Sequence, residues 1–325
     1  MLQYLIILLD DTSTSFCHYC LPPRLVEGRL QGKNASPKGE GSGRLMPIET
    51  LRQGIRFGMM ENLMIQYVYP SNELPATYNK VIESIDHSKI KPTKEDADVW
   101  VTDDIIDVES DVPVVWRTDK QGLYEHKSHI IKTLENVPRL NIVLTDIETF
   151  TDEDCDAYKA MLRSLSVEIE QMYVNEKSPQ LNLLTDRMML SHMNNCGAGE
   201  TTITLAPNGK FYLCPAFYYE DKDDSIGDLE HGLDIKNRQL YRLDHAPICR
   251  HCDAYQCKRC IWMNRKTTLE VNTPSHEQCV VAHLERNASR ELLHIIRKKG
   301  TFLPGQEEIK EIDYLDPFNI ANRWK

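Results

Sequence analysis

Apolar and polar stretches alternate up to residue 184 in a way that predicts repeated strand and helix units. Residues 2–9 (LQYLIILL) form a continuous apolar run that ends at Asp10 and Asp11, which is typical of a parallel strand covered on both faces. Pro47 then starts a stretch with apolar residues at helical spacing, and residues 64–69 (MIQYVY) predict the next strand. This alternation predicts an α/β fold with a parallel sheet or a partial barrel.

The same reasoning assigns the following elements. Thr151 and Asp154 match the spacing of a capping box at the start of a long helix. Residues 20–45, in contrast, are rich in Gly, Pro, Ser and charge, and they predict a flexible insertion. The remaining patterns predict helices at 74–85, 122–134 and 151–175, and strands at 99–101, 114–116, 140–145 and 181–184.

The texture of the sequence changes at Cys196. Residues 201–205 and 210–213 flank the turn Pro207-Asn208-Gly209 and predict a hairpin that ends at Cys214. Residues 249–260 predict no regular structure. A helix is expected from Pro274 and Ser275 through Arg297, carrying Cys279, and residues 301–325 are expected to form a tail on the surface.

Cysteine spacing in this second part indicates a metal site. Seven of the ten cysteines lie between residues 196 and 279, and the segment CRHCDAYQCKRC holds two CxxC pairs four residues apart. In a reducing compartment such spacing favours metal or redox chemistry over disulfides. Both zinc and iron–sulfur clusters are open by spacing alone. Seven cysteines do not divide into two complete four-thiolate zinc sites, which favours iron–sulfur.

Charge and hydropathy limit the possible partners and the compartment. The net charge of −11 argues against nucleic-acid binding, because phosphate recognition needs clustered Lys and Arg. No apolar run approaches the roughly 20 residues of a membrane helix, so we expect no membrane partner. The apolar run at residues 2–9 lacks a basic flank and a small-residue cleavage site, and we therefore expect a cytoplasmic protein.

The cysteine pattern Cys196-x12-Gly209-x4-Cys214, then CxxC-x4-CxxC and a final Cys279, resembles the SPASM domain of peptide-modifying radical SAM enzymes. The gaps on either side of Cys257 are each one residue shorter than usual. The resemblance implies two auxiliary [4Fe-4S] clusters. One would be held by Cys249, Cys252, Cys257 and Cys279, and the other by Cys196, Cys214 and Cys260.

The front of the chain partly resembles the radical SAM core. That core binds a [4Fe-4S] cluster and S-adenosylmethionine through Cys-x3-Cys-x2-Cys, and Cys17 and Cys20 match its second and third cysteines. Ser13 stands at the first position, and a hydroxyl is a poor iron ligand at neutral pH. The second strand ends in Tyr69-Pro70 where the core usually has Gly-Gly-Glu.

A narrower resemblance extends over nearly the whole chain. The segments LLDDTSTSFCHY, the helix after Pro47 with its VYP-ending strand, and CPAFYY...SIG resemble the CXXX repeat peptide maturases. This resemblance implies a radical SAM-like partial (β/α) barrel over residues 1–190, a SPASM-like iron–sulfur domain over 191–300 and a tail over 301–325. It also implies radical modification of a short, ribosomally made, cysteine-containing precursor peptide, with an electron donor protein as a further partner.

Two other functions stay open. A catalytically silent relative would bind the peptide, or relay electrons through its auxiliary clusters, for an active partner, and Ser13 favours this alternative. A zinc-stabilised binding module is the third reading. Asp10 and Asp11 end the first strand, where they either terminate it or contact substrate or cofactor. No residue is assigned as catalytic.

Overall fold

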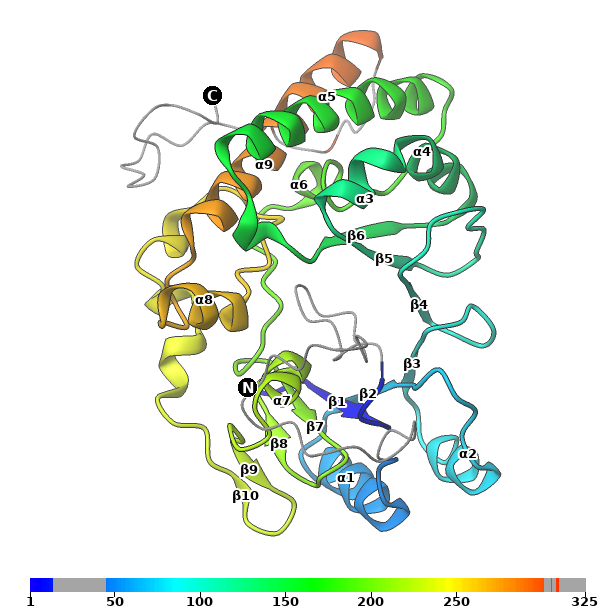
Figure 1. Ribbon diagram of the computed structural model, residues 1–325, viewed down its shortest axis with the longest axis vertical. Helices are drawn as coiled ribbons and strands as arrows, with labels where there is room; N and C mark the ends of the chain where they lie inside the picture. Colours follow the sequence, from blue (N-terminus) through cyan, green and yellow to red (C-terminus); the bar gives the residue numbers. More distant parts are fainter. Residues whose placement is uncertain (14–44, 301–304, 306–307, 310–325) are drawn as a thin grey trace, which may run out of the picture. The chain divides into compact units, whose positions relative to one another are not determined.

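The computed structural model describes residues 1–13, 45–300, 305 and 308–309. Most of the expected insertion at 20–45 and of the expected tail lies outside these residues, as do Cys17 and Cys20. The chain divides into two compact units (Figure 1). Unit 1 comprises Met1–Val101 and Gly197–Tyr241, and unit 2 comprises Thr102–Cys196 and Arg242–Lys325. The domain boundaries expected near residues 190 and 300 stay predictions.

Unit 1 is organised around the parallel strand β1 (Tyr4–Leu8). Strands β2 (Met64–Val68) and β7 (Thr202–Leu205) pair with β1 in parallel, one on each side. Beyond β2 the sheet continues in parallel through β3 (Ser88–Lys91) and β4 (Val99–Thr102), whereas β8 (Phe211–Tyr212) runs antiparallel to β7. Leu5, Ile7 and Leu8 are fully buried, which confirms the expectation of a central strand covered on both faces.

Helix α1 (Ile48–Met60) packs closely on this sheet because two of its residues lack a side chain. A Cβ atom at Gly54 would lie 2.3 Å from Cδ2 of Leu205, and one at Gly58 would lie 2.8 Å from Cδ1 of Ile65. Residues four apart lie on the same face of a helix. The two glycines therefore let α1 approach the sheet closely. The shorter helix α2 (Ala76–Ile82) connects β2 and β3.

Unit 2 contains the parallel strands β5 (Val114–Thr118) and β6 (Leu140–Leu144) together with most of the helices. Its long helices α5 (Asp152–Val174) and α9 (His276–Lys299) lie side by side (Figure 1). The capping box of Thr151 and Asp154 is present as expected, and Ser275 caps α9. The shorter helices are α3 (Lys120–Glu125), α4 (Lys127–Asn136), α6 (Asp186–Met189) and α8 (Ile261–Thr268).

The prediction of a strand at residues 181–184 is wrong, because the structure has an isolated bridge and a turn there. Only Leu181 forms a bridge, to Leu140, and the side-chain amide of Asn182 then replaces a strand residue by bonding to the backbone N and O of Ile142 (2.8 and 2.9 Å). The chain turns directly afterwards, because the Thr185 hydroxyl bonds to both the N–H and the C=O of Leu181. Local side-chain bonds thus end the pairing.

The expected helix at 122–134 is two helices, α3 and α4, which meet at His126. The His126 ring nitrogen Nδ1 lies 2.9 Å from the Gly122 carbonyl, and His126 has φ −106° and ψ 23°, which is outside the regular helical range. Periodicity continues across this break, so the apolar pattern does not reveal it.

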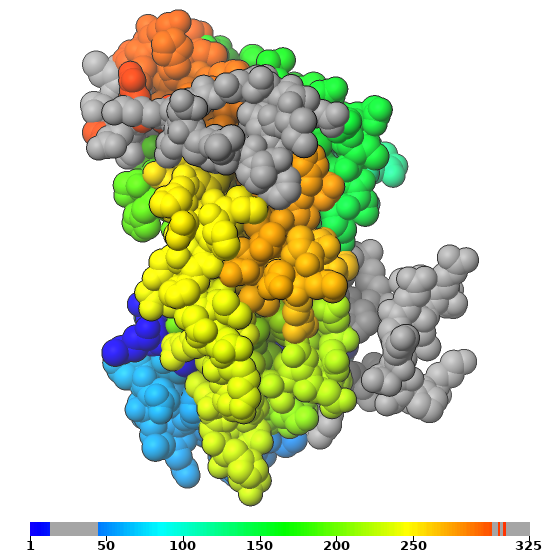
Figure 2. Space-filling model, turned by 90° about the vertical axis from the view of Figure 1, so that its left-hand side faces the viewer, coloured from blue at the N-terminus to red at the C-terminus, as the bar shows by residue number. Residues whose placement is uncertain are grey.

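Several short elements lie outside the ranges expected from the sequence. Strand β3 reads SKIK, and its Lys89 and Lys91 pair with Asp96 across a turn. Helix α7 (Pro215–Glu220) and the two-residue strands β9 (Gly227–Asp228) and β10 (Gly232–Leu233) follow Cys214. The β9–β10 hairpin, in yellow-green, lies at the surface (Figure 2), and its His231 side chain is 75% exposed.

No helix within residues 1–13 and 45–300 combines the length and the apolar character needed to cross a membrane.

Because α1 lies so close to the sheet, adding a side chain at this contact should destabilise the fold. Gly54→Val places a branched side chain against buried Leu205, and we expect it to lower the free energy of unfolding by about 1–3 kcal/mol. Gln53→Val puts the same residue on the exposed neighbouring position and controls for helix propensity. The measurement is urea unfolding followed by circular dichroism. Equal stability of the two variants would contradict the packing described here.

Candidate metal centre

The segment with the two CxxC pairs, residues 249–260, has almost no regular structure. Its one short element is the 3-10 turn Cys249–His251, in keeping with the sequence expectation. His251, which lies between the first two cysteines, is exposed. This segment, called the cysteine loop below, therefore needs contacts from other elements of unit 2 to fix its shape.

Buried polar side chains supply these contacts. Arg286 of α9 forms an ion pair with Asp253, and the two side chains are 4% and 1% exposed. Arg187 of α6 donates from Nε to the Asp253 carbonyl at 2.7 Å. Gln256 donates from Nε2 to the Ala282 carbonyl, also at 2.7 Å. The cysteine loop is thus held against α9 from two positions and against α6 from one.

This arrangement brings four cysteines to one cavity. Cys249, Cys252 and Cys257 of the cysteine loop and Cys279 from the first turn of α9 line it. These are the four residues that the sequence assigned to one auxiliary cluster. Four thiols are a donor set that fits a thiolate-bound metal group. That they hold a cluster stays a prediction.

Backbone N–H groups point at two of these sulfur atoms. The N–H of Ala254 donates to Sγ of Cys252, and the N–H of Arg259 donates to Sγ of Cys257, each at 3.4 Å. Arg259 has φ 44°, in the left-handed region that non-glycine residues rarely adopt. Strained backbone of this kind is common at functional sites. N–H donors of this kind stabilise thiolate ligands.

Burial keeps the thiols of Cys249 and Cys257 protonated in the absence of a cation. It raises the pKa of Cys249 to about 12, and the neighbouring Cys252 thiol adds to the effect. Burial also raises the pKa of Cys257, again together with neighbouring thiols. A metal cation reverses this, because it binds the thiolate form and displaces the protons. Metal binding at this cavity should therefore release protons.

The second predicted set of ligands is divided between the units. Cys214 is buried and precedes α7 in unit 1, whereas Cys196 and Cys260 belong to unit 2. Within unit 2 the backbone N–H of Cys196 donates to the Lys258 carbonyl at 3.3 Å, which joins it to the cysteine loop, and Cys260 is buried just before α8. The assignment of Cys196, Cys214 and Cys260 to one cluster stays a prediction.

Ser13, at the first position of the radical SAM motif, is fully buried in a turn that ends β1. Its Oγ accepts a hydrogen bond from the Asp10 N–H at 3.1 Å, and its own N–H donates to the Asp10 carbonyl at 3.2 Å. Asp10 Oδ1 accepts the N–H of Thr12 at 2.7 Å. Ser13 thus serves the turn, and it does not fit the role of a third thiolate beside Cys17 and Cys20, which lie outside the described residues.

Helix α7 braces the same turn within unit 1. The Tyr218 hydroxyl donates to Asp11, and Lys222 lies 3.2 Å from the other carboxylate oxygen of Asp11. The Tyr219 hydroxyl donates to the Ser13 carbonyl at 2.7 Å. Asp10 and Asp11 therefore both have structural partners. The aromatic pair after Cys214 was part of the sequence resemblance, but its contact with the end of β1 was not foreseen.

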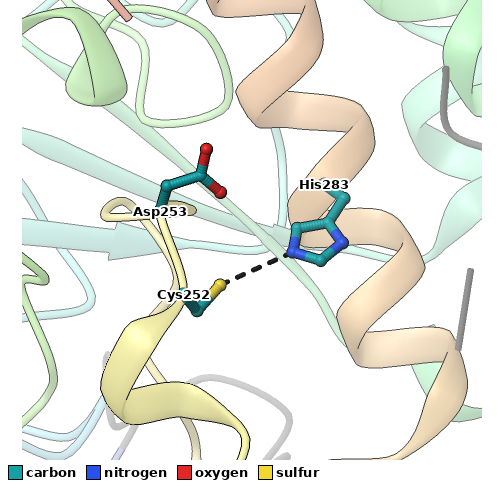
Figure 3. Close-up of side chains that lie close together, drawn as sticks. All are labelled: Cys252, Asp253 and His283. Atoms are coloured by element: carbon teal, nitrogen blue, oxygen red, sulfur yellow. Dashed lines mark hydrogen bonds between the residues drawn. The ribbon is translucent and has the colours of Figure 1, made fainter. Parts of the chain in front are cut away.

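The sequence analysis missed His283, which also lines the cysteine cavity. Figure 3 shows its ring beside the Cys252 thiol, with Asp253 next to both. The sequence does hold a signal that could have indicated His283. It follows Cys279 by four residues on α9, and residues at that spacing share a helix face. Arg259 was missed as well, and no local pattern in the sequence indicates its left-handed conformation.

The structure is an α/β fold with a mainly parallel sheet and a cysteine-rich C-terminal region, and it is similar to the fold of radical SAM enzymes. Similar solved structures include those of anSMEcpe, a radical SAM/SPASM anaerobic sulfatase-maturating enzyme. The form with bound AdoMet has a TM-score of 0.58 at 11% identity. The form with AdoMet and the Cp18Cys peptide has 0.54 at 12%. Each match covers 91% of this chain and 99% of the other.

At this level of identity the likeness shows the fold alone. No protein-family model and no curated protein matches the sequence. The expected partial barrel with a cysteine-rich C-terminal region is thus confirmed as a fold, while the narrower resemblance to CXXX repeat peptide maturases stays a prediction.

A half-buried acid, Glu285, contacts the cysteine loop. Glu285 of α9 accepts hydrogen bonds from the Tyr158 hydroxyl of α5 at 2.8 Å and from Gln256 at 3.3 Å. Burial of the carboxyl raises the pKa of Glu285 to about 7 from its ordinary 4.5. The carboxyl therefore ionises at lower pH in the unfolded chain than in the folded chain. The protonated carboxyl is favoured in the folded chain, and its contribution to stability is lost as the pH rises from about 4.5 through about 7.

Glu285→Gln should remove this dependence. We expect the unfolding free energy of the wild type, relative to that of the variant, to fall by up to about 3 kcal/mol as the pH rises across that range. Glu291→Gln, at an exposed position of the same helix, is the matched control. Denaturant unfolding at a series of pH values measures the difference. A difference that does not change with pH, or that grows as the pH rises, would refute the assignment.

Proposed function

We propose that the chain is an iron–sulfur protein of peptide maturation that acts on a small, ribosomally made, cysteine-containing precursor peptide. The observation that carries the proposal is the cavity in which Cys249, Cys252, Cys257 and Cys279 meet. The radical SAM fold supports it, as does the peptide bound to one structural neighbour of that fold. An electron donor protein would be a further partner, and a cytoplasmic location stays an expectation.

Zinc and an iron–sulfur cluster differ in how closely they bring their thiolate ligands together. A tetrahedral zinc site has Zn–S distances of about 2.3 Å, which bring its sulfur atoms within about 3.8 Å of one another. Among the described residues, the group of three metal-ligating side chains whose donor atoms lie within 4.8 Å of one another is Cys252, Asp253 and His283, and no such group consists of three cysteines. The sulfurs around the cavity are thus spread more widely than a single zinc ion requires.

The chain's own contribution at this site is to hold and shield the ligands. The ion pair of Asp253 and Arg286 fixes the cysteine loop, and the N–H groups of Ala254 and Arg259 stabilise thiolate charge. Cys249 is buried, and Cys252, Cys257 and Cys279 are partly buried. A cluster bound here would supply a one-electron acceptor or donor for the peptide modification.

Two roles in maturation are distinct. In the first, the chain itself performs the radical step with S-adenosylmethionine and a third cluster at Cys17 and Cys20. In the second, it is a silent relative that binds the peptide or relays electrons for an active partner. The engagement of the Ser13 hydroxyl in the turn after β1 favours the second role.

Metal and sulfide analysis of cysteine variants tests the cavity. In anaerobically purified protein, Cys252→Ala and Cys279→Ala should each lose about four irons per chain relative to the wild type. Cys155→Ala should keep all of them, because Cys155 lies on α5 and does not line the cavity. Zinc without sulfide in the wild type would support the zinc-stabilised binding module and end the iron–sulfur proposal.

Cleavage of S-adenosylmethionine by the reduced protein separates the two roles. We expect no cleavage by the wild type or by Ser13→Ala, and we expect Ser13→Cys to gain it, because the new thiol completes a three-cysteine set. The measurement is the release of 5′-deoxyadenosine under anaerobic conditions. Cleavage by the wild type would overturn the silent role and support radical chemistry by this chain.

A further inference from the structure

His283 lies in the wall of the cysteine cavity, and neither the sequence pattern nor the fold likeness assigns it a role. It is 4% exposed. It projects from the same face of α9 as Cys279, which lies one turn before it on the helix. Buried histidines need polar partners, because an unpaired ring nitrogen is costly in a low-dielectric interior. Its contacts therefore indicate what it does.

One of these contacts is with a predicted ligand. Nε2 of His283 lies 3.5 Å from Sγ of Cys252, within hydrogen-bonding range for sulfur, as the dashed line in Figure 3 shows. The same sulfur accepts the N–H of Ala254 at 3.4 Å. Cys252 thus receives one backbone donor from its own loop and one side-chain contact from α9.

One carboxylate oxygen of Asp253, the third member of this group, is engaged by another partner: Oδ1 pairs with Arg286, whereas Oδ2 has no hydrogen-bond partner among the described residues. Asp253 pairs with Arg286, which lies one turn after His283 on α9, and both side chains are almost completely buried. A separate metal ion held by Cys252, Asp253 and His283 would have to compete with this guanidinium. Breaking a buried ion pair leaves an uncompensated charge and is strongly unfavourable. The geometry therefore favours a hydrogen bond from His283 over a ligand role.

We propose that His283 is a positioning residue of the metal centre, whose Nε2–H donates a hydrogen bond to the Cys252 thiolate and raises the reduction potential of the cluster. This inference rests on the proposed iron–sulfur function. A metal-bound thiolate has no proton to give, so the proton of this bond must come from the imidazole. A donor at the sulfur stabilises the added negative charge of the reduced form more than the oxidised form, which sets the direction of the change.

Two substitutions of His283 in the full chain test the proposal. His283→Leu removes the donor, whereas His283→Gln keeps a side-chain N–H of similar reach. Both should retain the iron content of the wild type. Redox titration followed by electron paramagnetic resonance should give a lower potential for the Leu variant, by an amount that makes reduction about tenfold less favourable, or about 59 mV for one electron. The Gln variant should lie closer to the wild type.

The Cys252→Ala variant shows which electron paramagnetic resonance signal belongs to this centre, because that signal is the one the variant lacks. A potential in His283→Leu equal to that of the wild type would overturn the proposal. So would loss of the cluster from both His283 variants with circular dichroism unchanged, since this would make His283 a metal ligand. Zinc in place of iron in the wild type would instead mean that the proposed function itself has failed, and metal analysis separates this case from the other two.

Discussion

The ion pair between Asp253 and Arg286 is the contact on which the candidate site depends. It joins residues 33 positions apart, and it lies in the interior of unit 2, where water cannot replace either partner. Removing one partner of a buried pair typically costs about 3–5 kcal/mol, because the other charge stays behind unpaired. The cysteine loop has little regular structure of its own. Its shape is therefore set by this pair and by the bonds of Arg187 and Gln256.

Once the cysteine loop is fixed on α9, the remaining features of the centre follow. Cys279 and His283 come to the cavity because they share a face of α9. The backbone N–H of Arg259 donates to Sγ of Cys257. The resulting burial disfavours free thiolates, and a bound cation is the natural compensation. The local structure is thus arranged to bind a cation, which agrees in sign with the net negative charge of the chain.

Local patterns in the sequence could predict the fold class and three of the cavity cysteines, and the resemblance to the SPASM domain added Cys279. A continuous apolar run marked β1, a capping box marked the start of α5, and CxxC spacing marked the cysteine loop. Such patterns could not predict contacts between distant residues. The pair of Asp253 and Arg286, the bond between His283 and Cys252, and the contact of Tyr219 with Ser13 all depend on tertiary structure. The prediction of a strand at residues 181–184 was wrong for a related reason. The Asn182 side chain, and not its backbone, bonds to the backbone of Ile142.

The central claim is that the four thiols around the cavity hold a group with several irons. X-ray absorption of anaerobically purified wild-type protein at the iron edge tests this claim most directly. Iron surrounded by sulfur, with a second shell of neighbouring iron atoms, is the predicted result. Metal that absorbs at the zinc edge, with thiolate or imidazole ligands and no neighbouring metal atom, would contradict the account.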